Sequence, residues 1–362
     1  MKFSVSKDKL LEGLSTVQNV VSTRTTLPIL SNVLLQASDG EVRLTTTDLD
    51  VGIRGSIEAQ VARTGATTLP ARRLLSIVRE LPSSEIYFDV DTKNFASIRS
   101  GSSYFKILGL PEEEFPSLAR FEEAKIFTIA QKDLKDGLKK TSYAISVDET
   151  RYVLNGILFS FKDNKLTLVA TDGRRLALVE LEVEFPSSQE AEIIVSTKAV
   201  TEIQRLLREE GEVKLSVGEN QIAFELNRTL LVSKLIEGSY PNYRQVIPAD
   251  AKERIRLERE TFLTAVRRVS LLASEKSVKL IFTKSNIDIV ANTPEVGEAK
   301  ESLPVMYQGR EYSIAFNPEF LMAPLRNLSE EEIYLDLIDE LSPGVIKIAG
   351  PFLYVLMPVR LS

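Results

Sequence analysis

The sequence predicts an α+β fold made of three tandem copies of one module, each with an antiparallel sheet and two helices. Three observations lead to this prediction. A short alternating run followed by a helical stripe recurs three times, hairpin signals follow each of these helices, and a second helix signal follows each hairpin region. The chain of 362 residues has room for three modules of about 120 residues each.

The first helix of each module is predicted from apolar residues at positions i, i+4, i+7 and i+11, which share one face of an α-helix. The alternating runs that precede these helices begin at Lys2, Lys125 and Arg254. The same register returns 124 and 252 residues after the first copy. The three stripes are Leu10, Leu14, Val17 and Val21, then Leu134, Leu138, Thr141 and Ile145, then Phe262, Val266, Val269 and Ala273.

A small residue occupies the same position in each of these helices, namely Gly13, Gly137 and Ala265. Glycine inside a helix costs about 1 kcal/mol relative to alanine, so its recurrence at one site calls for a reason. We expect a close approach between helices at this position. Coincidence is the alternative.

Hairpin turns are expected where two turn-forming residues separate alternating runs, at Asp39-Gly40, Asp163-Asn164 and Ser285-Asn286. A second helix follows each of these strand regions. These helices open with Pro70-Ala71, Ser196-Thr197 and Asn317-Pro318, because such residues favour helix starts. In the third module we expect Pro324 to kink or shorten the helix.

The modules are predicted to span residues 1–120, 125–247 and 252–362. The boundaries fall in the acidic, proline-bearing segment after Pro111 and in the segment that follows Ile247. Three copies of one module in a chain indicate a curved or ring-like array.

The composition excludes several kinds of catalysis. The chain contains no His and no Cys, so it has no histidine base, no serine–histidine triad, no thiol nucleophile and no zinc site of the usual ligands. No phosphate-cradling glycine motif occurs, and we expect no cofactor, no metal and no catalytic residue. The absence of a signal peptide or membrane-spanning run predicts a cytoplasmic protein without membrane contact.

Charge is distributed unevenly along the chain. The predicted helical segments 7–20, 71–80, 131–141, 198–210, 259–276 and 317–328 carry 17 Lys and Arg against 11 Asp and Glu. The helices therefore carry +6, and since the whole chain carries −6, the remainder carries −12. If the helices share a face, that face suits a nucleic-acid backbone; ordinary solvated helices are the alternative. The main basic clusters are Arg72, Arg73 and Arg79, then Lys132, Lys135, Lys139 and Lys140, then Arg259, Arg267, Arg268 and Lys276.

Two aspartates recur at equivalent positions after predicted strands, Asp48 and Asp172. Together with Asp89 and Asp91 they could hold a metal in a carboxylate-dependent hydrolase. Recurrence in successive modules favours a turn-capping role instead. The apolar C-terminal segment from Pro351 is interpreted from its residues as a last strand. The alternative is that Met357 and the residues after it line a partner groove.

Several long stretches resemble a known family. They read TLPILSNVLL at 26–35, LTTTDLD at 44–50, LPARRLLSI at 69–77, RYVLNGILF at 151–159, LVATDGRRLAL at 168–178, SKLIEGSYPNYRQVIP at 233–248 and VLMPVRL at 355–361. With these residues the chain resembles bacterial sliding clamps, the beta subunits of DNA polymerase III, over essentially its whole length.

The resemblance implies three clamp domains per chain and a head-to-tail homodimer that forms a ring with helices lining the channel. The ring would encircle double-stranded DNA without sequence specificity, as a non-catalytic processivity subunit of the DNA-directed DNA polymerase holoenzyme. Its partners would be the replicative polymerase, the clamp loader, and other polymerases and repair proteins. They would bind through short hydrophobic peptides.

The resemblance also assigns residues, and it reverses the interpretation of the C-terminal segment. DNA-facing residues would be Arg24, Arg72, Tyr152 and Lys198. The partner-peptide groove would comprise Leu154, Thr171, Gly173, Arg174, Arg175, Leu176, Pro241 and Val246 from the second module, with Asn317, Phe320, Val345, Val355, Met357, Pro358, Val359 and Arg360 from the third. The dimer contact would pair Arg73, Ile77, Leu81, Phe105 and Ile107 with Leu271 and Leu272 of the partner chain.

Some positions depart from the family pattern. Val153 stands where many relatives carry an aromatic residue, Arg174 where some carry histidine, and Val359 where methionine is frequent. Ser362 extends beyond the usual terminal leucine. These departures affect the peptide preference rather than the fold. Two other classes of protein stay open at this point: the carboxylate-dependent hydrolase, and a monomeric scaffold of three interaction modules.

Overall fold

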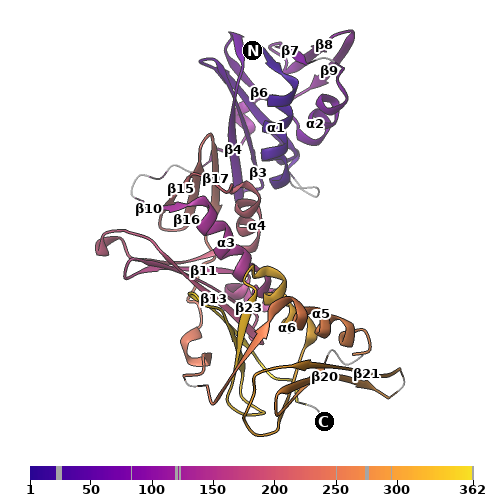
Figure 1. Ribbon diagram of the computed structural model, residues 1–362. Coiled ribbons are helices and arrows are strands. Elements are labelled where there is room, and N and C mark those ends of the chain that lie inside the picture. The colour runs from indigo at the N-terminus through magenta and orange to yellow at the C-terminus, as the bar shows by residue number, and fades with distance from the viewer. Residues whose placement is uncertain are drawn as a thin grey trace. The chain divides into compact units, whose positions relative to one another are not determined.

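The computed structural model describes residues 1–21, 27–82, 84–118, 121, 124–249, 251–273, 277–294 and 296–360. The described residues form six α-helices: α1 Lys7–Val17, α2 Ala71–Glu80, α3 Gln131–Thr141, α4 Thr197–Leu206, α5 Arg259–Ser270 and α6 Pro318–Asn327. Two helices therefore lie in each predicted module, as expected (Figure 1).

The strands of the first predicted module are β1 Lys2–Ser6, β2 Asn32–Ser38, β3 Glu41–Thr47, β4 Val51–Glu58, β5 Gln60–Arg63, β6 Gly65–Pro70, β7 Glu85–Val90, β8 Phe95–Ser100 and β9 Ser103–Leu108. Those of the second are β10 Lys125–Ala130, β11 Gly156–Lys162, β12 Lys165–Thr171, β13 Arg175–Glu182, β14 Ala191–Ser196, β15 Glu212–Val217, β16 Gln221–Leu226 and β17 Thr229–Lys234. Those of the third are β18 Glu253–Glu258, β19 Val278–Thr283, β20 Asn286–Thr293, β21 Gly297–Pro304, β22 Tyr312–Phe316, β23 Glu332–Leu337, β24 Gly344–Lys347 and β25 Phe352–Leu356.

The chain divides into two compact units. One consists of Met1–Lys132 with Lys198–Leu235, and the other of Asp133–Thr197 with Ile236–Ser362. The strands of the middle third are therefore shared between the units.

The first unit contains two antiparallel sheets. The smaller sheet has the order β5-β1-β7-β8-β9, and the larger has the order β10-β15-β16-β17-β4-β3-β2-β6. The larger sheet joins strands of the first and second modules where β4 pairs with β17, with Ile53 opposite Leu231. Helices α1 and α2 pack against each other in this unit (Figure 1).

The second unit repeats this plan. Its larger sheet has the order β14-β11-β12-β13-β25-β24-β23-β18, and its smaller sheet has the order β21-β20-β19-β22. The pairing of β13 with β25, with Leu176 opposite Val355, joins strands of the second and third modules. The sequence predicts a single sheet in each module. Instead, the strands of each module belong to two sheets, and the eight-stranded sheets continue from one module into the next.

The predicted helix stripes are buried except for Ala273, which is half-buried. Leu10, Leu14 and Val17 of α1 are inaccessible to solvent, as are Leu134 and Leu138 of α3 and Phe262 and Val266 of α5. Burying one such side chain contributes about 1.5–3 kcal/mol, so these stripes fix each helix on its sheet.

The glycines inside α1 and α3 allow a contact between helix and sheet, whereas the sequence predicts one between helices. A Cβ at Gly13 would lie 2.7 Å from Leu44 and 2.8 Å from Ile57, and a Cβ at Gly137 would lie 2.9 Å from Leu168. All three contacted side chains belong to strands. The missing side chain therefore lets the helix approach its sheet, and the expectation of a helix–helix contact was wrong.

Two of the predicted hairpin turns are confirmed. Asp39 and Gly40 adopt φ of 48° and 79°, and Asp163 and Asn164 adopt 53° and 55°, the left-handed conformation that tight hairpins require. The third turn is displaced by one residue, because Thr283 pairs with Asn286 and the loop is Lys284-Ser285. Asn286 therefore begins β20 rather than completing the turn.

Helix α6 passes through Pro324 and ends at Asn327. Proline has no backbone N–H, so the carbonyl four residues earlier, that of Phe320, receives no helical hydrogen bond from it. The hydroxyl of Tyr354 on β25 donates to this carbonyl over 2.8 Å. The helix is thus neither ended nor shortened at Pro324, and a side chain from the neighbouring strand supplies the missing donor.

Candidate functional site

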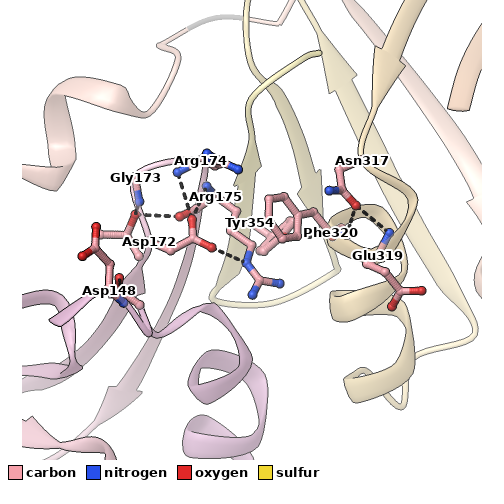
Figure 2. A network of polar contacts seen from close by, with 11 residues as sticks. Asp148, Asp172, Gly173, Arg174, Arg175, Asn317, Glu319, Phe320 and Tyr354 are labelled. Atoms are coloured by element: carbon pink, nitrogen blue, oxygen red, sulfur yellow. Dashed lines mark hydrogen bonds and ion pairs between the residues drawn. The ribbon is translucent and has the colours of Figure 1, made fainter. Parts of the chain in front are cut away.

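The turn between β12 and β13 is held by short side-chain hydrogen bonds. Oδ1 of Asp172 accepts from the backbone N–H groups of Arg174 and Arg175 over 2.9 and 3.1 Å. The hydroxyl of Thr171 donates to the carbonyl of Arg175 over 2.6 Å and accepts from the N–H of Gly173 over 3.1 Å. Gly173 has φ of +86°, which disfavours any residue with a Cβ. The turn presents Gly173 and Arg174 to solvent (Figure 2).

Arg175 connects this turn to α6. Its Nε donates to Oδ2 of Asp172 over 3.0 Å, and its guanidinium carbon lies 4.3 Å from the centre of the Phe320 ring. The Arg175 side chain is only 14% exposed. A guanidinium over an aromatic face at this distance is attracted by the ring quadrupole. The contact joins residues from the second and third predicted modules (Figure 2).

The start of α6 is fixed by Asn317 and Tyr354. Oδ1 of Asn317 accepts from the backbone N–H of Glu319 over 2.9 Å and of Phe320 over 3.4 Å, which is the helix cap that the sequence predicts. Burial raises the pKa of the Tyr354 phenol, so the hydroxyl stays protonated and donates to Phe320. Phe320 is therefore held by its N–H, its carbonyl and its ring.

Below this junction lies an apolar cluster. Leu176 and Val355 are opposite each other in β13 and β25, and Val345 of β24 pairs with Val355 from the other side. All three are buried. The backbone N–H of Met357 donates to the carbonyl of Arg174 over 3.0 Å, which holds the exposed Met357 beside the turn. The buried residues that make up the cluster together with Leu176 and Val355 are Leu158, Val169, Leu178, Ile194 and Tyr243.

The remaining groove residues lie in the same unit. Leu154 is buried at the end of the 3-10 helix Glu149–Leu154, while Pro241 and Val246 are exposed on either side of Tyr243. After β25, the backbone N–H of Val359 donates to Ala315 over 2.8 Å. Pro358 and Val359 are half-buried, and Arg360 is exposed.

The residues expected to face DNA are dispersed. Arg72 is exposed on α2, Lys198 lies in the first turn of α4, and Tyr152 is exposed in the second unit. Arg24 lies outside the described residues. The side chain of Lys198 is 40% exposed and bonds the carboxylate of Asp48 as well as the carbonyl of Val20 over 3.4 Å.

Several lysines and arginines of the predicted helical clusters are already paired. Lys140 is buried and bonds Asp136 over 2.8 Å and Glu330 over 3.1 Å, so its charge is neutralised inside the second unit. Arg268 pairs with the carboxylate of Glu301. The helix charge count therefore overstates the free positive charge, because sequence gives no view of such partners. Exposed cluster residues that make no ion pair with another described residue are Arg72, Arg73, Arg79, Lys132, Lys139 and Arg267.

The residues expected at a dimer contact differ in exposure. Phe105 on β9 is 38% exposed and Leu271 after α5 is 79% exposed. Leu81 and Ile107 are buried within their own unit. Arg73 is exposed, and Ile77 and Leu272 are half-buried. Strand β9 is the last strand of its sheet.

The two recurring aspartates are turn caps. Asp48 accepts from the backbone N–H groups of Asp50 and Val51 over 3.1 and 2.8 Å, in the same way that Asp172 caps its own turn. In the part of the chain that the structure describes, no three His, Cys, Asp or Glu residues gather where they could hold a metal ion. Among the described helices, none is long and apolar enough to cross a membrane.

Comparisons with known proteins identify the family. The N-terminal, central and C-terminal domains of the DNA polymerase III beta subunit match residues 1–119, 128–242 and 244–360. The chain belongs to the bacterial sliding-clamp family. The beta sliding clamps of Chlamydia muridarum and Escherichia coli are 36% and 35% identical to it over all of this chain, covering 99% and 100% of those proteins.

Solved sliding clamps share the fold over the full length of both chains. The clamp from Bacillus subtilis superposes with a TM-score of 0.96 at 31% identity. A clamp from Pseudomonas aeruginosa, solved bound to griselimycin, does so with a TM-score of 0.96 at 33% identity. The three-domain clamp fold expected from the sequence is thereby confirmed.

The chain is thus a DNA sliding clamp, a processivity factor that encircles duplex DNA and tethers the replicative polymerase. The family is the non-catalytic subunit of the polymerase and acts as a dimer on DNA with polymerase and other partners. The hydrolase and the monomeric scaffold are both set aside by this membership.

Sequence reasoning missed two parts of this clamp's candidate groove. The sequence pattern identifies Tyr354 only as one residue of an apolar strand and not as the donor to the Phe320 carbonyl. The signal that could have revealed it is Pro324 inside a predicted helix, since the carbonyl four residues earlier then needs another donor. The link from Asp172 through Arg175 to Phe320 was also missed, because it joins residues far apart in sequence.

Proposed function

We propose that this clamp binds short hydrophobic partner peptides in a groove of its second unit, at the junction of β13, β25 and α6. The observation that carries the proposal is the Arg175–Phe320 contact, beside the exposed Met357 and above the buried pair Leu176 and Val355. An apolar base with cations at its edge fits an apolar peptide that carries a terminal or side-chain carboxylate. Each Leu or Phe that such a peptide buries contributes about 1.5–3 kcal/mol.

The remaining groove residues complete this site. Leu154, Pro241 and Val246 form one side, and Pro358, Val359 and Arg360 follow Met357 on the other. Because they share one proposed groove, the polymerase catalytic subunit, the clamp loader and repair proteins compete for it and exchange. Arg174 adds a positive charge at its edge, and Val153 and Val359 tune the peptide preference.

We also propose that Arg24, Arg72, Tyr152 and Lys198 face the DNA in the ring. The support is the excess of Lys and Arg on the helices, of which Arg72 is exposed without an ion pair to another described residue. Such contacts reach phosphates and carry no sequence preference. They weaken with salt, which allows the ring to slide.

The proposed dimer contact is head to tail. One side of the contact consists of Arg73, Ile77 and Phe105, with Leu81 and Ile107 beneath them. The other side consists of Leu271 and Leu272 of the partner protomer. The support is the exposure of Phe105 on an edge strand and of Leu271 after α5. Two such contacts close a ring when the rotation between protomers is one half-turn. We place this ring in the cytoplasm.

The ring is tested by loading the clamp onto DNA with a clamp loader. We expect retention on nicked circular DNA and rapid loss after the circle is linearised, because a ring held topologically leaves through a free end. Equal retention on both forms would contradict encirclement. The mass in solution is the control, since a monomer would contradict the dimer contact.

The groove is tested by removing residues 357–362. We expect the truncated chain to stay a folded dimer and to lose binding of a peptide that carries the apolar tail of the polymerase. Phe105→Asp is the matched control, because it should break the dimer and leave peptide binding intact. Peptide binding that survives the truncation would show that the groove lies elsewhere.

A further inference from the structure

Two turns in the chain share one hydrogen-bond pattern. Asp48 and Asp172 each follow a strand and cap the next turn, with Oδ1 accepting from the N–H groups two and three residues later. The residue after each aspartate is left-handed, with φ of +80° at Leu49 and +86° at Gly173. The two turns are therefore structural copies of each other in successive modules.

The second carboxylate oxygen makes a different bond in each copy. Oδ2 of Asp48 accepts from Nζ of Lys198, and Oδ2 of Asp172 accepts from Nε of Arg175. Both carboxylate side chains are 17% exposed. Shielding from water makes a charge-assisted bond stronger than one between freely exposed side chains. Capping uses one oxygen, so the other is available to hold a cation.

In the second unit this bond fixes a guanidinium. Arg175 donates from its Nε edge to Asp172 and places the face of its guanidinium over the ring of Phe320. Phe320 is itself held through the Tyr354 hydroxyl and the Asn317 cap. Without the Asp172 charge, the Arg175 side chain would be free to adopt other rotamers, and the proposed groove would lose its ordered cationic wall.

In the first unit the same bond restrains an ammonium. Lys198 donates to Asp48 and to the carbonyl of Val20, and it keeps 40% of its side chain exposed. A DNA phosphate that approaches Lys198 competes with the carboxylate for the same protons. The local repulsion between Asp48 and a phosphate also opposes binding. Asp48 therefore lowers the affinity of this contact, which suits a ring that must slide.

We propose that the turn aspartate of each of these two modules is a positioning residue for the cation of a binding surface: Asp172 orders Arg175 for the partner peptide, and Asp48 restrains Lys198 toward DNA. This inference rests on the proposed groove and the proposed DNA-facing role of Lys198. The two aspartates are chemically identical, but their losses have opposite effects. Loss of Asp172 lowers the affinity for the partner peptide, and loss of Asp48 raises the affinity for DNA.

The test replaces each aspartate by asparagine in the full-length dimer. An asparagine oxygen still caps the turn but carries no charge for the cation. For Asp172→Asn we expect about a tenfold loss of affinity for a fluorescent peptide carrying the polymerase tail, with DNA affinity unchanged. For Asp48→Asn we expect roughly a threefold to tenfold gain in affinity for a short fluorescent duplex, with peptide affinity unchanged.

The salt dependence separates positioning from general loosening. Asp48→Asn should steepen the slope of log affinity against log salt by about 0.9 per protomer, as one further phosphate contact forms. Lys198→Met in the Asp48→Asn background should remove both the gain and the steeper slope. A folded Asp48→Asn chain with unchanged or lower DNA affinity would overturn the role of Asp48. So would a gain that survives Lys198→Met.

A second variant tests the role of Asp172 in the proposed groove. Arg175→Lys keeps the charge but loses the planar contact with Phe320, and should lose as much peptide affinity as Asp172→Asn. If Asp172→Asn unfolds, this variant carries the test. Unchanged peptide affinity in either folded variant would overturn the role of Asp172. If the wild-type chain itself binds no peptide, or keeps it after truncation at residue 356, the proposed groove fails instead.

Discussion

The hydroxyl of Tyr354 donates a hydrogen bond of 2.8 Å to the carbonyl of Phe320, the carbonyl that Pro324 leaves without its helical partner. A strand of the third module thereby compensates a proline in the helix beside it. The ring of the same Phe320 lies against Arg175, so the bond also fixes one side of the proposed groove. The defect in α6 and the order of the groove are thus linked through one backbone group.

The first prediction concerns this bond. Tyr354→Phe should lower the free energy of unfolding by about 1–3 kcal/mol, because it leaves the carbonyl of the half-buried Phe320 without a donor. In a Pro324→Ala background the helix supplies an N–H to that carbonyl. Tyr354→Phe should then lower the free energy of unfolding by distinctly less. Urea unfolding of the four variants measures the coupling. If Tyr354→Phe lowers the free energy of unfolding equally in both backgrounds, the hydroxyl of Tyr354 does not compensate for the N–H that Pro324 lacks.

The second prediction concerns the cap of α6. Asn317→Ala should lower the free energy of unfolding by about 1 kcal/mol, since the N–H groups of Glu319 and Phe320 lose their acceptor. Asn317→Asp is the control, because an aspartate accepts the same bonds and favours a helix start. We also expect Asn317→Ala to weaken peptide binding through Phe320. Loss of stability in the aspartate variant as well would contradict capping as the cause.

Local features of the fold could be predicted from the sequence, and long-range pairings could not. The stripe that includes Leu10 and Leu14, the hairpin at Asp39-Gly40 and the cap at Asn317 depend on neighbours within a few residues, and each was predicted correctly. The pairing of Leu176 with Val355 joins strands from two modules. Nothing in a local pattern specifies the partner of an edge strand, so the shared eight-stranded sheets were not predicted.

The same distinction between local features and long-range contacts applies to the candidate site. The residues named for the groove came from resemblance, and their physical connections came from the structure. Lys140 illustrates the limit: it was counted as a basic surface residue, yet it is buried between Asp136 and Glu330. A charge count includes only the residues of one segment, whereas the residue that neutralises a charge can lie almost two hundred residues away in the sequence.

The third prediction concerns acid stability. Burial opposes ionisation of Asp336, which is 2% exposed, but hydrogen bonds from Arg254 and Lys347 outweigh it and lower the pKa of Asp336 below its ordinary value of 3.8. The unfolded chain therefore takes up this proton at a higher pH than the folded chain does. The stabilisation is complete above the unfolded pKa and is lost as the pH falls through the folded pKa.

Asp336→Asn should therefore lower the free energy of unfolding by roughly 1–3 kcal/mol at neutral pH and make it less sensitive to acid below about pH 4. Glu332→Gln on the same strand is the matched control. Its ion pair with Arg256 is exposed on both sides and contributes about 0–1 kcal/mol. Thermal unfolding across this pH range provides the measurement. If the stability of Asp336→Asn depends on acid as strongly as that of the wild type, a group other than Asp336 causes the acid sensitivity.

The last prediction compares the left-handed residues of the two copied turns. Leu49 holds φ of +80° with an exposed side chain, a conformation that costs an ordinary residue about 1–2 kcal/mol. Leu49→Asn should therefore raise the free energy of unfolding by about 0.5–1 kcal/mol, since asparagine tolerates this region. Gly173→Ala should do the reverse, because the added Cβ is strained at φ of +86° and lies 2.7 Å from Nη1 of Arg151. Urea unfolding measures both variants, and a loss of stability in Leu49→Asn would mean that the leucine side chain contributes a contact that outweighs its backbone strain.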